Sequence, residues 1–347
     1  MKNGIATALL SAALFGASTP LAKLLLGAID PWTLAGLLYL GSGVGLGGIT
    51  LFARARSAVS TEAKVAISDL PWLAGAVIAG GIIGPVTLMF GLAKASASSA
   101  ALLLNLEGLA TMGIAWIVFR ESVDRRLLFG AAAILAGAMV LTWHGGAMRF
   151  GPGSPLIALA CLAWGIDNNL TRKVSAANPI QIAAIKGVVA GSVNLAIAAT
   201  LDATLPAITT LMASAMVGFI GYGLSLALFV LALRHLGAAR TGAYFSTAPF
   251  VGAVFSIALL HDPLTTQLGM AALLMAIGVW LHLTEHHAHQ HTHERVVHDH
   301  SHTHDRHHQH EHNPDHPPNE PHAHRHQHVH LTHKHPHYPD LHHQHSH

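Results

Sequence analysis

The chain of 347 residues is strongly apolar: hydrophobic residues make up 51% of it, charged residues only 10%, and its mean hydropathy is +0.44. Because a soluble domain carries roughly 25% charged residues, this composition excludes an ordinary soluble protein. The formal net charge of +2 hides a basic body and an acidic tail from Thr284 onward, and we expect no nucleic-acid partner. The single cysteine, Cys161, excludes a disulfide framework and a cysteine-based metal site.

Apolar runs along the chain predict ten transmembrane helices, since about 20 such residues cross a bilayer. In chain order they cover residues 4–26, 31–52, 72–92, 97–119 and 127–143, then 155–170, 179–200, 211–233, 237–260 and 264–283. The sequence therefore predicts an all-α integral membrane protein surrounded by the lipid bilayer.

The two halves of the chain share a repeated pattern. In both, an aromatic residue and a glycine are followed, after six residues, by a basic residue, and then by a polar residue and a proline. The paired positions are Phe15 and Trp164, Gly16 and Gly165, Lys23 and Arg172, Asp30 and Asn178, and Pro31 and Pro179. Five spans per half is an odd number, so the second half is expected to enter the membrane inverted.

Inverted repeats place a binding site at the membrane midplane, between two halves that rock against each other. We therefore expect a carrier with a first repeat at residues 1–145 and a second repeat at 150–284. Basic residues in the short loops predict its orientation: with the N-terminus inside, 11 Lys and Arg face the cytoplasm and two, Lys94 and Arg149, face outward. The chain is thus expected in the inner membrane, with its N-terminus and C-terminal tail in the cytoplasm.

Ionisable side chains inside spans are costly unless they face a cavity or a partner. Those of interest are Lys23, Glu107, Asp167 and Lys186, and Asn168 follows Asp167 directly. We expect these five residues to form a substrate site, centred on Glu107 near the middle of the fourth span. Lys186 is interpreted either as the partner of Glu107 or as an anion-binding group.

Each of these assignments has a structural alternative. Glu107 and Lys186 would equally serve as a tie between two helices. Lys23 would equally extend to the outer headgroups. Asp167 would equally pair at the interface with the basic residues that follow it in the sequence.

Two longer segments carry a family resemblance: LLLNLEGLATMGIAWIVFRES in the first half and LRHLGAARTGAYFSTAPFVGAVFSIALLHDPLT in the second. Together with the paired aromatic-glycine motif, they resemble the EamA family of the drug/metabolite transporter superfamily. The resemblance covers about residues 4–283 and implies ten helices in two repeats and a transport function. It leaves the substrate open, since that family moves amino acids, nucleotide-related metabolites, sugars and drugs.

The chain departs from the family pattern in two places. The family typically carries an acidic or polar residue followed by proline in the fourth and ninth spans, whereas this chain has Glu107-Gly108 in the fourth and keeps Pro249 in the ninth. The family also tends to place an arginine early in the second and seventh spans, where this chain has Leu38 and Lys186. A symmetric role for charge in the two halves is therefore not expected.

The tail at residues 285–347 is the second unusual feature, because 27 of the 30 histidines lie from His282 onward. It has almost no apolar content and is expected to be disordered. Neutral imidazole binds Ni, Zn, Co and Cu, and the expected ligands are His286, His287, His289, His291, His293, His298, His300, His302, His304, His307, His308, His310 and His312. The alternative is a low-complexity extension that binds metal incidentally.

Two functions remain open from the sequence. The first is a secondary transporter that exports a small organic metabolite or drug, with proton coupling through Glu107 and a metal-binding tail. The second is a divalent-metal efflux carrier for Ni, Co or Zn whose tail collects or senses the ion; a pH-sensing tail is a weaker third interpretation. No nucleophile, base or phosphate-binding glycine motif indicates an enzyme, and no resident cofactor is expected. A homodimer is one assembly that the sequence allows.

Overall fold

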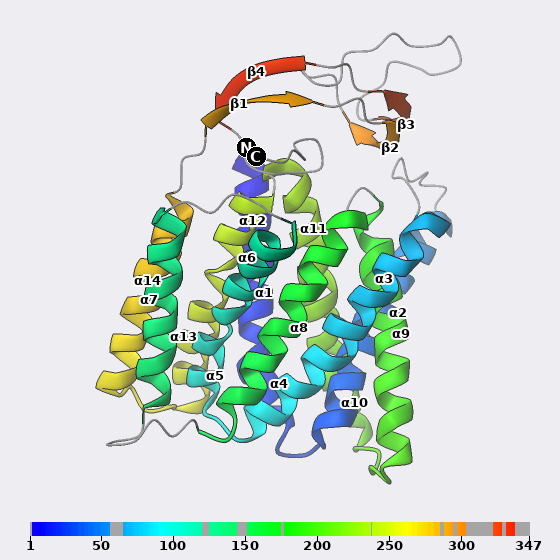
Figure 1. Cartoon of the computed structure of the whole chain (residues 1–347). Helices are drawn as coiled ribbons and strands as arrows, with labels where there is room; N and C mark the ends of the chain where they lie inside the picture. Colours follow the sequence, from blue (N-terminus) through cyan, green and yellow to red (C-terminus); the bar gives the residue numbers. More distant parts are fainter. Residues whose placement is uncertain are drawn as a thin grey trace.

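The computed structural model describes residues 2–55, 65–119, 125–143, 151–174, 177–236, 238–284, 288–293, 297–302, 322–327 and 331–336. Long helices run side by side in one bundle (Figure 1). Those of the first half are α1 (Lys2–Leu25), α2 (Pro31–Ala55), η1 (Ile67–Asp69), α3 (Leu70–Ala76), η2 (Val77–Ile83), α4 (Gly84–Ala93), α5 (Ala97–Leu103), α6 (Leu106–Phe119) and α7 (Arg125–Thr142).

Apart from the short helix η1, the described part of the second half follows the same order of elements. It consists of α8 (Ser154–Val174), α9 (Pro179–Thr200), α10 (Ile208–Val217), η3 (Gly218–Leu224), α11 (Ser225–Leu236), α12 (Ala238–Phe245), α13 (Ala248–Leu260) and α14 (Thr266–Leu283). Both halves carry a seven-residue π-helix inside their third helical segment, η2 and η3. Both also break their fourth segment, between α5 and α6 and between α12 and α13.

The breaks interrupt the helices predicted at residues 97–119 and 237–260, although Ala97–Phe119 as a whole is still long and apolar enough to span a membrane. Polar side chains at each break hydrogen-bond to the preceding turn, which competes with the helical backbone pattern. The amide of Asn105 donates to the carbonyl of Leu102 at 2.9 Å, and the hydroxyl of Thr247 donates to Tyr244 at 2.7 Å. Pro249, which lacks a backbone N–H, occupies the first turn of α13.

The second helix of each half begins at a proline that follows a capping side chain. Asp30 Oδ1 accepts a hydrogen bond from the backbone N–H of Thr33 at 3.0 Å, ahead of α2. Asn178 Oδ1 accepts two, from the next two residues that carry an N–H, at 2.9 Å and 3.1 Å, ahead of α9. A capping oxygen followed by proline at the first helical position is a strong helix start, which explains why this pair occurs in both halves.

Equivalent helices of the two halves pack against each other. The α2–α9 and α7–α14 pairs lie toward opposite edges of the bundle (Figure 1). The first helix of each half packs on a helix of the other half: α1 packs on α13, and α8 packs on α6. The repeated glycines lie in the last two contacts. A Cβ on Gly16 would collide with the carbonyl of Ala248, and one on Gly165 would come within 2.7 Å of the Cβ of Ala110, so glycine permits these close crossings.

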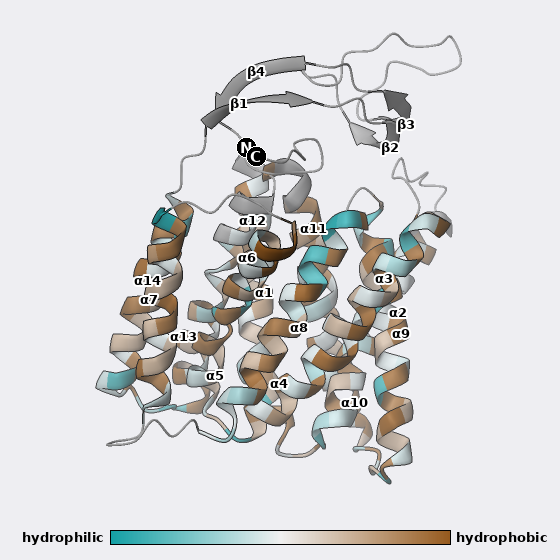
Figure 2. Cartoon of the chain, viewed as in Figure 1, coloured by the Kyte–Doolittle hydropathy of each residue, from teal (hydrophilic) through white to brown (hydrophobic). Residues whose placement is uncertain are grey.

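Eight helical stretches within the described residues are long and apolar enough to span a membrane. The eight include neither α8, in which Asp167-Asn168-Asn169 lowers the hydropathy, nor the two short pieces α12 and α13. Figure 2 shows apolar residues along the outer helices and hydrophilic residues toward one end of α8. α8 also extends to Val174, one turn beyond the predicted end at residue 170.

The described part of the tail forms four strands, β1 (Ala288–His293), β2 (Val297–His302), β3 (His322–Gln327) and β4 (Leu331–Pro336). β1 pairs antiparallel with β4, and β2 with β3. Sequence analysis predicted no regular structure here, and the strands are a difference from that prediction. Pairing satisfies backbone hydrogen bonds without needing a core, although an isolated two-stranded sheet is marginal in water.

Candidate substrate site

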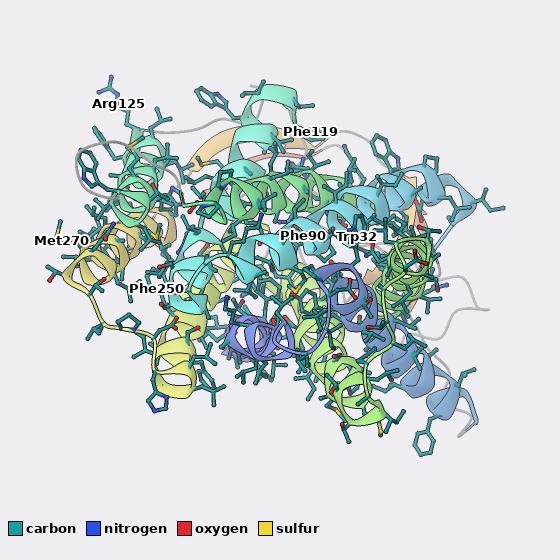
Figure 3. The ribbon with its side chains drawn as sticks, turned by 90° about the horizontal axis from the view of Figure 1, so that it is seen from below. Trp32, Phe90, Phe119, Arg125, Phe250 and Met270 are labelled. Carbon is teal, nitrogen blue, oxygen red and sulfur yellow. The ribbon has the colours of Figure 1, made fainter. Side chains whose placement is uncertain are left out.

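A cavity lies where helices of the two halves meet. It holds about 530 Å³ of empty space, counting the part open to solvent. Its lining comes from α1, α2, α6, α8, α9, η3, α11 and α12 and consists of Phe15, Tyr39, Glu107, Trp164, Asp167, Asn168, Lys186, Gly221, Tyr222, Ser225, Leu226, Phe229 and Phe245. Other aromatic contacts lie outside it: Trp32 and Phe90, labelled in Figure 3, pack with ring centroids 6.2 Å apart and are not among the lining residues.

Asp167 and Lys186 form a buried ion pair on one wall of the cavity. Lys186 Nζ lies 2.6 Å and 2.7 Å from the two carboxylate oxygens and donates a third hydrogen bond to Thr171 Oγ1 at 3.3 Å. The side chains are only 3% and 8% exposed. A buried charge without a partner is energetically costly, so each of these two residues offsets the cost of burying the other.

This pairing decides between interpretations that the sequence left open. Among the described residues, Lys186 forms its salt bridge with Asp167 and not with Glu107. The sequence-equivalent positions in the first repeat are Ser18 and Leu38. The ion pair therefore belongs to the second repeat alone, so the two halves contribute unequally to the site.

Glu107 lies in the first turn of α6, directly after the helix break. The positive end of a helix dipole stabilises a carboxylate at this position. Glu107 Oε1 accepts a hydrogen bond from the amide of Asn168 at 2.9 Å, and the same amide donates to Thr111 Oγ1 at 3.1 Å. Among the described residues, no basic side chain forms a salt bridge with Glu107.

Six aromatic rings surround these polar groups, and each touches at least one other. Phe15 is central: its ring centroid lies 6.0 Å from that of Trp164, 5.8 Å from Tyr222 and 5.4 Å from Phe245. Tyr39 continues the cluster beyond Tyr222 at 5.5 Å, and Phe229 continues it beyond Phe245 at 4.8 Å. The repeated aromatic positions, Phe15 and Trp164, thus meet at the junction of the two halves.

The π-helix η2 supplies the backbone behind this wall. The carbonyl of Gly80 accepts hydrogen bonds from the hydroxyl of Tyr39 at 2.5 Å and from the indole of Trp164 at 2.9 Å, and the carbonyl of Gly81 accepts one from Asn194 at 3.0 Å. A Cβ on Gly80 would collide with the carboxylate of Asp167. The π-helix therefore orients two cavity rings and leaves room for the ion pair, in keeping with the frequent placement of π-bulges at functional sites.

Of the five predicted substrate residues, the structure brings four together: Glu107, Asp167, Asn168 and Lys186 all line the cavity. Lys23 does not line it. Its ammonium group donates to the carbonyls of Leu92 and Ala95 at 2.6 Å and 2.8 Å, at the C-terminal end of α4, where a cation is favoured by the helix dipole.

Sequence reasoning missed the aromatic residues of the site. Phe15 and Trp164 were visible as the first member of the repeated motif, but their placement on a cavity wall was not predicted. Tyr39, Tyr222, Phe229 and Phe245 carry no sequence signal that separates them from the many other apolar residues, because they reach the cavity only through the crossing of distant helices.

The tail histidines are only partly described. Six predicted ligands lie in strands, His289, His291 and His293 in β1 and His298, His300 and His302 in β2. The backbone register sets the β2 histidines opposite histidines of β3. The others lie outside the described residues, namely His286, His287, His304, His307, His308, His310 and His312. Within the described part of the chain, no group of three or more His, Cys, Asp or Glu is placed to hold a metal ion.

Comparison with known proteins identifies the family. Residues 2–143 and 151–284 each match the EamA-like transporter family. The chain belongs to this EamA family. Two matches, one per half, agree with the repeated order of helices. The family assignment shows a membrane transporter of the drug/metabolite type and confirms the resemblance found in the sequence.

Two similar proteins agree with the EamA assignment, but neither has a description that names a substrate. A curated protein of Methanothermobacter thermautotrophicus, described as an uncharacterized transporter, is 27% identical over 281 residues, which is 77% of this chain and 82% of that protein. A solved crystal structure superposes with a TM-score of 0.59 at 18% identity and covers 81% of this chain and 96% of that one. The latter likeness shows the fold alone.

Proposed function

We propose that this EamA-family protein is a secondary transporter that exports a small organic metabolite or drug through the cavity at Glu107. The observation that carries the proposal is the position of the cavity: its lining comes from both halves, and equivalent residues of the two repeats, Phe15 and Trp164, meet on its wall. A site shared by two halves is exposed to either side of the membrane when one half rocks against the other.

The proposed arrangement has ten membrane crossings in two inverted repeats, with α8 and the α12–α13 pair as the sixth and ninth. α8 is too polar to resemble a span in isolation, but its polar residues face the cavity or neighbouring helices: Asp167 and Asn169 are buried. The excess of basic residues in the loops supports a cytoplasmic N-terminus and tail in the inner membrane. A homodimer remains a prediction from the sequence.

Proton coupling through Glu107 is part of the proposal. The carboxyl group sits in the cavity beside the amide of Asn168, with no cationic partner in salt-bridge range among the described residues. A carboxyl group in such a place takes up a proton or a cation more readily than it stays charged and alone. Exchange of a proton for substrate at this group would couple the two movements.

Transport tests this proposal directly. The full-length protein in proteoliposomes should accumulate a solute from a panel of amino acids, amines, nucleosides and drugs when a pH gradient is imposed. Glu107→Gln keeps the side-chain shape, and it should abolish the response to the gradient while the protein still inserts. Asp202→Asn, which removes a carboxylate from an exposed loop, should transport normally. Gradient-driven transport by Glu107→Gln equal to the parent would contradict the coupling role.

The alternative is a divalent-metal efflux carrier, which the 27 histidines from His282 onward favour. The membrane part gives it less support, since its described residues hold no cluster of three metal-ligating side chains. We propose that the tail binds Ni, Zn, Co or Cu as an appendage. Growth of a strain lacking the protein, compared with its parent across metals and toxic organic compounds, distinguishes the two functions: metal sensitivity supports the carrier, and sensitivity to organic compounds supports the exporter.

A further inference from the structure

We propose that the cavity selects an organic monocation, a protonated amine on a flat apolar body, with Glu107 as its counter-ion. The inference rests on the proposed transport function and adds a substrate class to it. It follows from three properties of the cavity: its balance of charge, its aromatic walls and its shortage of hydrogen-bond donors.

The charge balance leaves one carboxylate over. Apart from the tyrosines, which are neutral near pH 7, the lining contains two acidic side chains, Glu107 and Asp167, and one basic side chain, Lys186. Asp167 and Lys186 neutralise each other at 2.6 Å, away from solvent. Among the described residues, the side chain that donates a hydrogen bond to the Glu107 carboxylate is the neutral amide of Asn168. The cavity with Glu107 ionised therefore has a net charge of about −1, which a single positive charge on the substrate would complete.

The aromatic walls suit the same ligand. Six aromatic side chains line the cavity together with Glu107: Phe15, Tyr39, Trp164, Tyr222, Phe229 and Phe245. The polar atoms of Tyr39 and Trp164 are both engaged with the carbonyl of Gly80. What these two residues offer to a ligand is thus mainly ring surface. Ring faces attract ammonium groups, and the attraction strengthens where water is excluded.

The shortage of donors disfavours a substrate carboxylate. The ammonium of Lys186 directs three hydrogen bonds to Asp167 and Thr171. The amide of Asn168 donates to Glu107 and Thr111, and the hydroxyl of Ser225 donates to the carbonyl of Ser11 at 2.9 Å.

The remaining donor among the described lining side chains is the hydroxyl of Tyr222, which lies beside the hydroxyl of Ser18. A carboxylate on the ligand would find one hydroxyl and a neighbouring carboxylate. The desolvation of an anion needs several donors or a cation to offset it. The cavity should therefore reject amino acids in favour of the amines of the same shape.

The test uses three probes that share one ring and differ in charge: phenethylamine as cation, phenylalanine as zwitterion and 3-phenylpropionate as anion. Binding to the full-length protein in detergent micelles is measured by titration calorimetry at neutral pH. We expect phenethylamine to bind at least about tenfold more tightly than either other probe. Equal or tighter binding of phenylalanine or 3-phenylpropionate, or no binding of phenethylamine, would overturn the inference.

Two pairs of variants locate the selectivity. Glu107→Gln should weaken phenethylamine binding by about tenfold or more, while Asp202→Asn, with the same loss of one charge, should leave it unchanged. Phe229→Leu removes a cavity ring and should weaken binding by several-fold, while Phe90→Leu removes a ring outside the lining and should not. Unchanged affinity in Glu107→Gln contradicts the counter-ion role, and equal effects of the two phenylalanine changes contradict the aromatic contribution.

Transport by the same preparation in proteoliposomes separates this inference from the proposed function. If the protein transports phenylalanine or another solute but does not bind phenethylamine, the proposed transport function stands and the proposed cationic substrate class is rejected. If the protein binds phenethylamine but transports no solute of the panel, the cation-binding site stands and the proposed transport function is rejected.

Discussion

The ammonium group of Lys186 lies 2.6 Å and 2.7 Å from the two carboxylate oxygens of Asp167, so one lysine satisfies both oxygens of one carboxylate. The two residues come from consecutive helices of the second repeat, α8 and α9, and both side chains are buried. The pair fixes these helices to each other beside the cavity and withholds both charges from a ligand.

Breaking the pair should therefore destabilise the protein more than removing it. Lys186→Met leaves a buried carboxylate without a cation and should cost about 3–5 kcal/mol, whereas replacing both partners should cost far less. The measurement is thermal unfolding in detergent of Lys186→Met, Asp167→Asn and the double variant. A double variant as unstable as the sum of the two single variants would show that the residues do not act as a pair.

Gly80→Ala should disrupt the same pair from the other side. The new Cβ would occupy the space of the Asp167 carboxylate, so the side chain must move at a cost of about 1–3 kcal/mol. Gly47→Ala is the control, because nothing lies within 4 Å of a Cβ at that position of α2. We expect a lower unfolding temperature for Gly80→Ala and an unchanged or higher one for Gly47→Ala. Equal unfolding temperatures for the two variants would show that Gly80 is not constrained.

The tail should be separable from the membrane part. A chain ending at Thr284, the residue after α14, should insert and unfold at the same temperature as the full chain, because the buried core lies in the helices. It should no longer be retained on an immobilised nickel column. The full chain with His144, His235 and His261 each changed to Asn is the control and should be retained. Strong retention of the shortened chain would place a metal site in the membrane part and favour metal efflux.

Cysteine labelling should establish the orientation. In a Cys161→Ala background, Leu205→Cys and Ile67→Cys occupy positions that are 80% and 86% exposed, on opposite sides of the membrane in the proposed topology. An impermeant thiol reagent added to intact cells should label Leu205→Cys only, and both should label after the membrane is opened. Labelling of Ile67→Cys in intact cells would reverse the orientation.

Much of the fold follows from local features of the sequence. The length of the apolar runs predicted ten spans, and eight of them correspond to described helical stretches that are apolar enough to span a membrane. The paired motif predicted two related halves, and each half matches the family separately. Irregularities within helices were not predictable in this way. The π-helix η2 depends on side chains from distant parts of the chain, since Tyr39, Trp164 and Asn194 hydrogen-bond to its carbonyls. The breaks at Asn105 and Thr247 involve local hydrogen bonds to the preceding turn, but Asn and Thr also occur within continuous helices, so the residue type alone did not predict a break.

The candidate site shows the same division. The positions of Glu107, Asp167 and Lys186 within predicted spans already indicated that each needs a partner or a cavity, since an isolated charge within a span is too costly. The sequence could not determine which charge pairs with which. Asp167 pairs with Lys186 because helix packing brings α8 and α9 together against the glycine surface of η2, a contact that the spacing of these residues in the sequence does not reveal. The same packing assembled six aromatic rings around Glu107, because helix crossings bring together residues whose spacing in the sequence carries no such information.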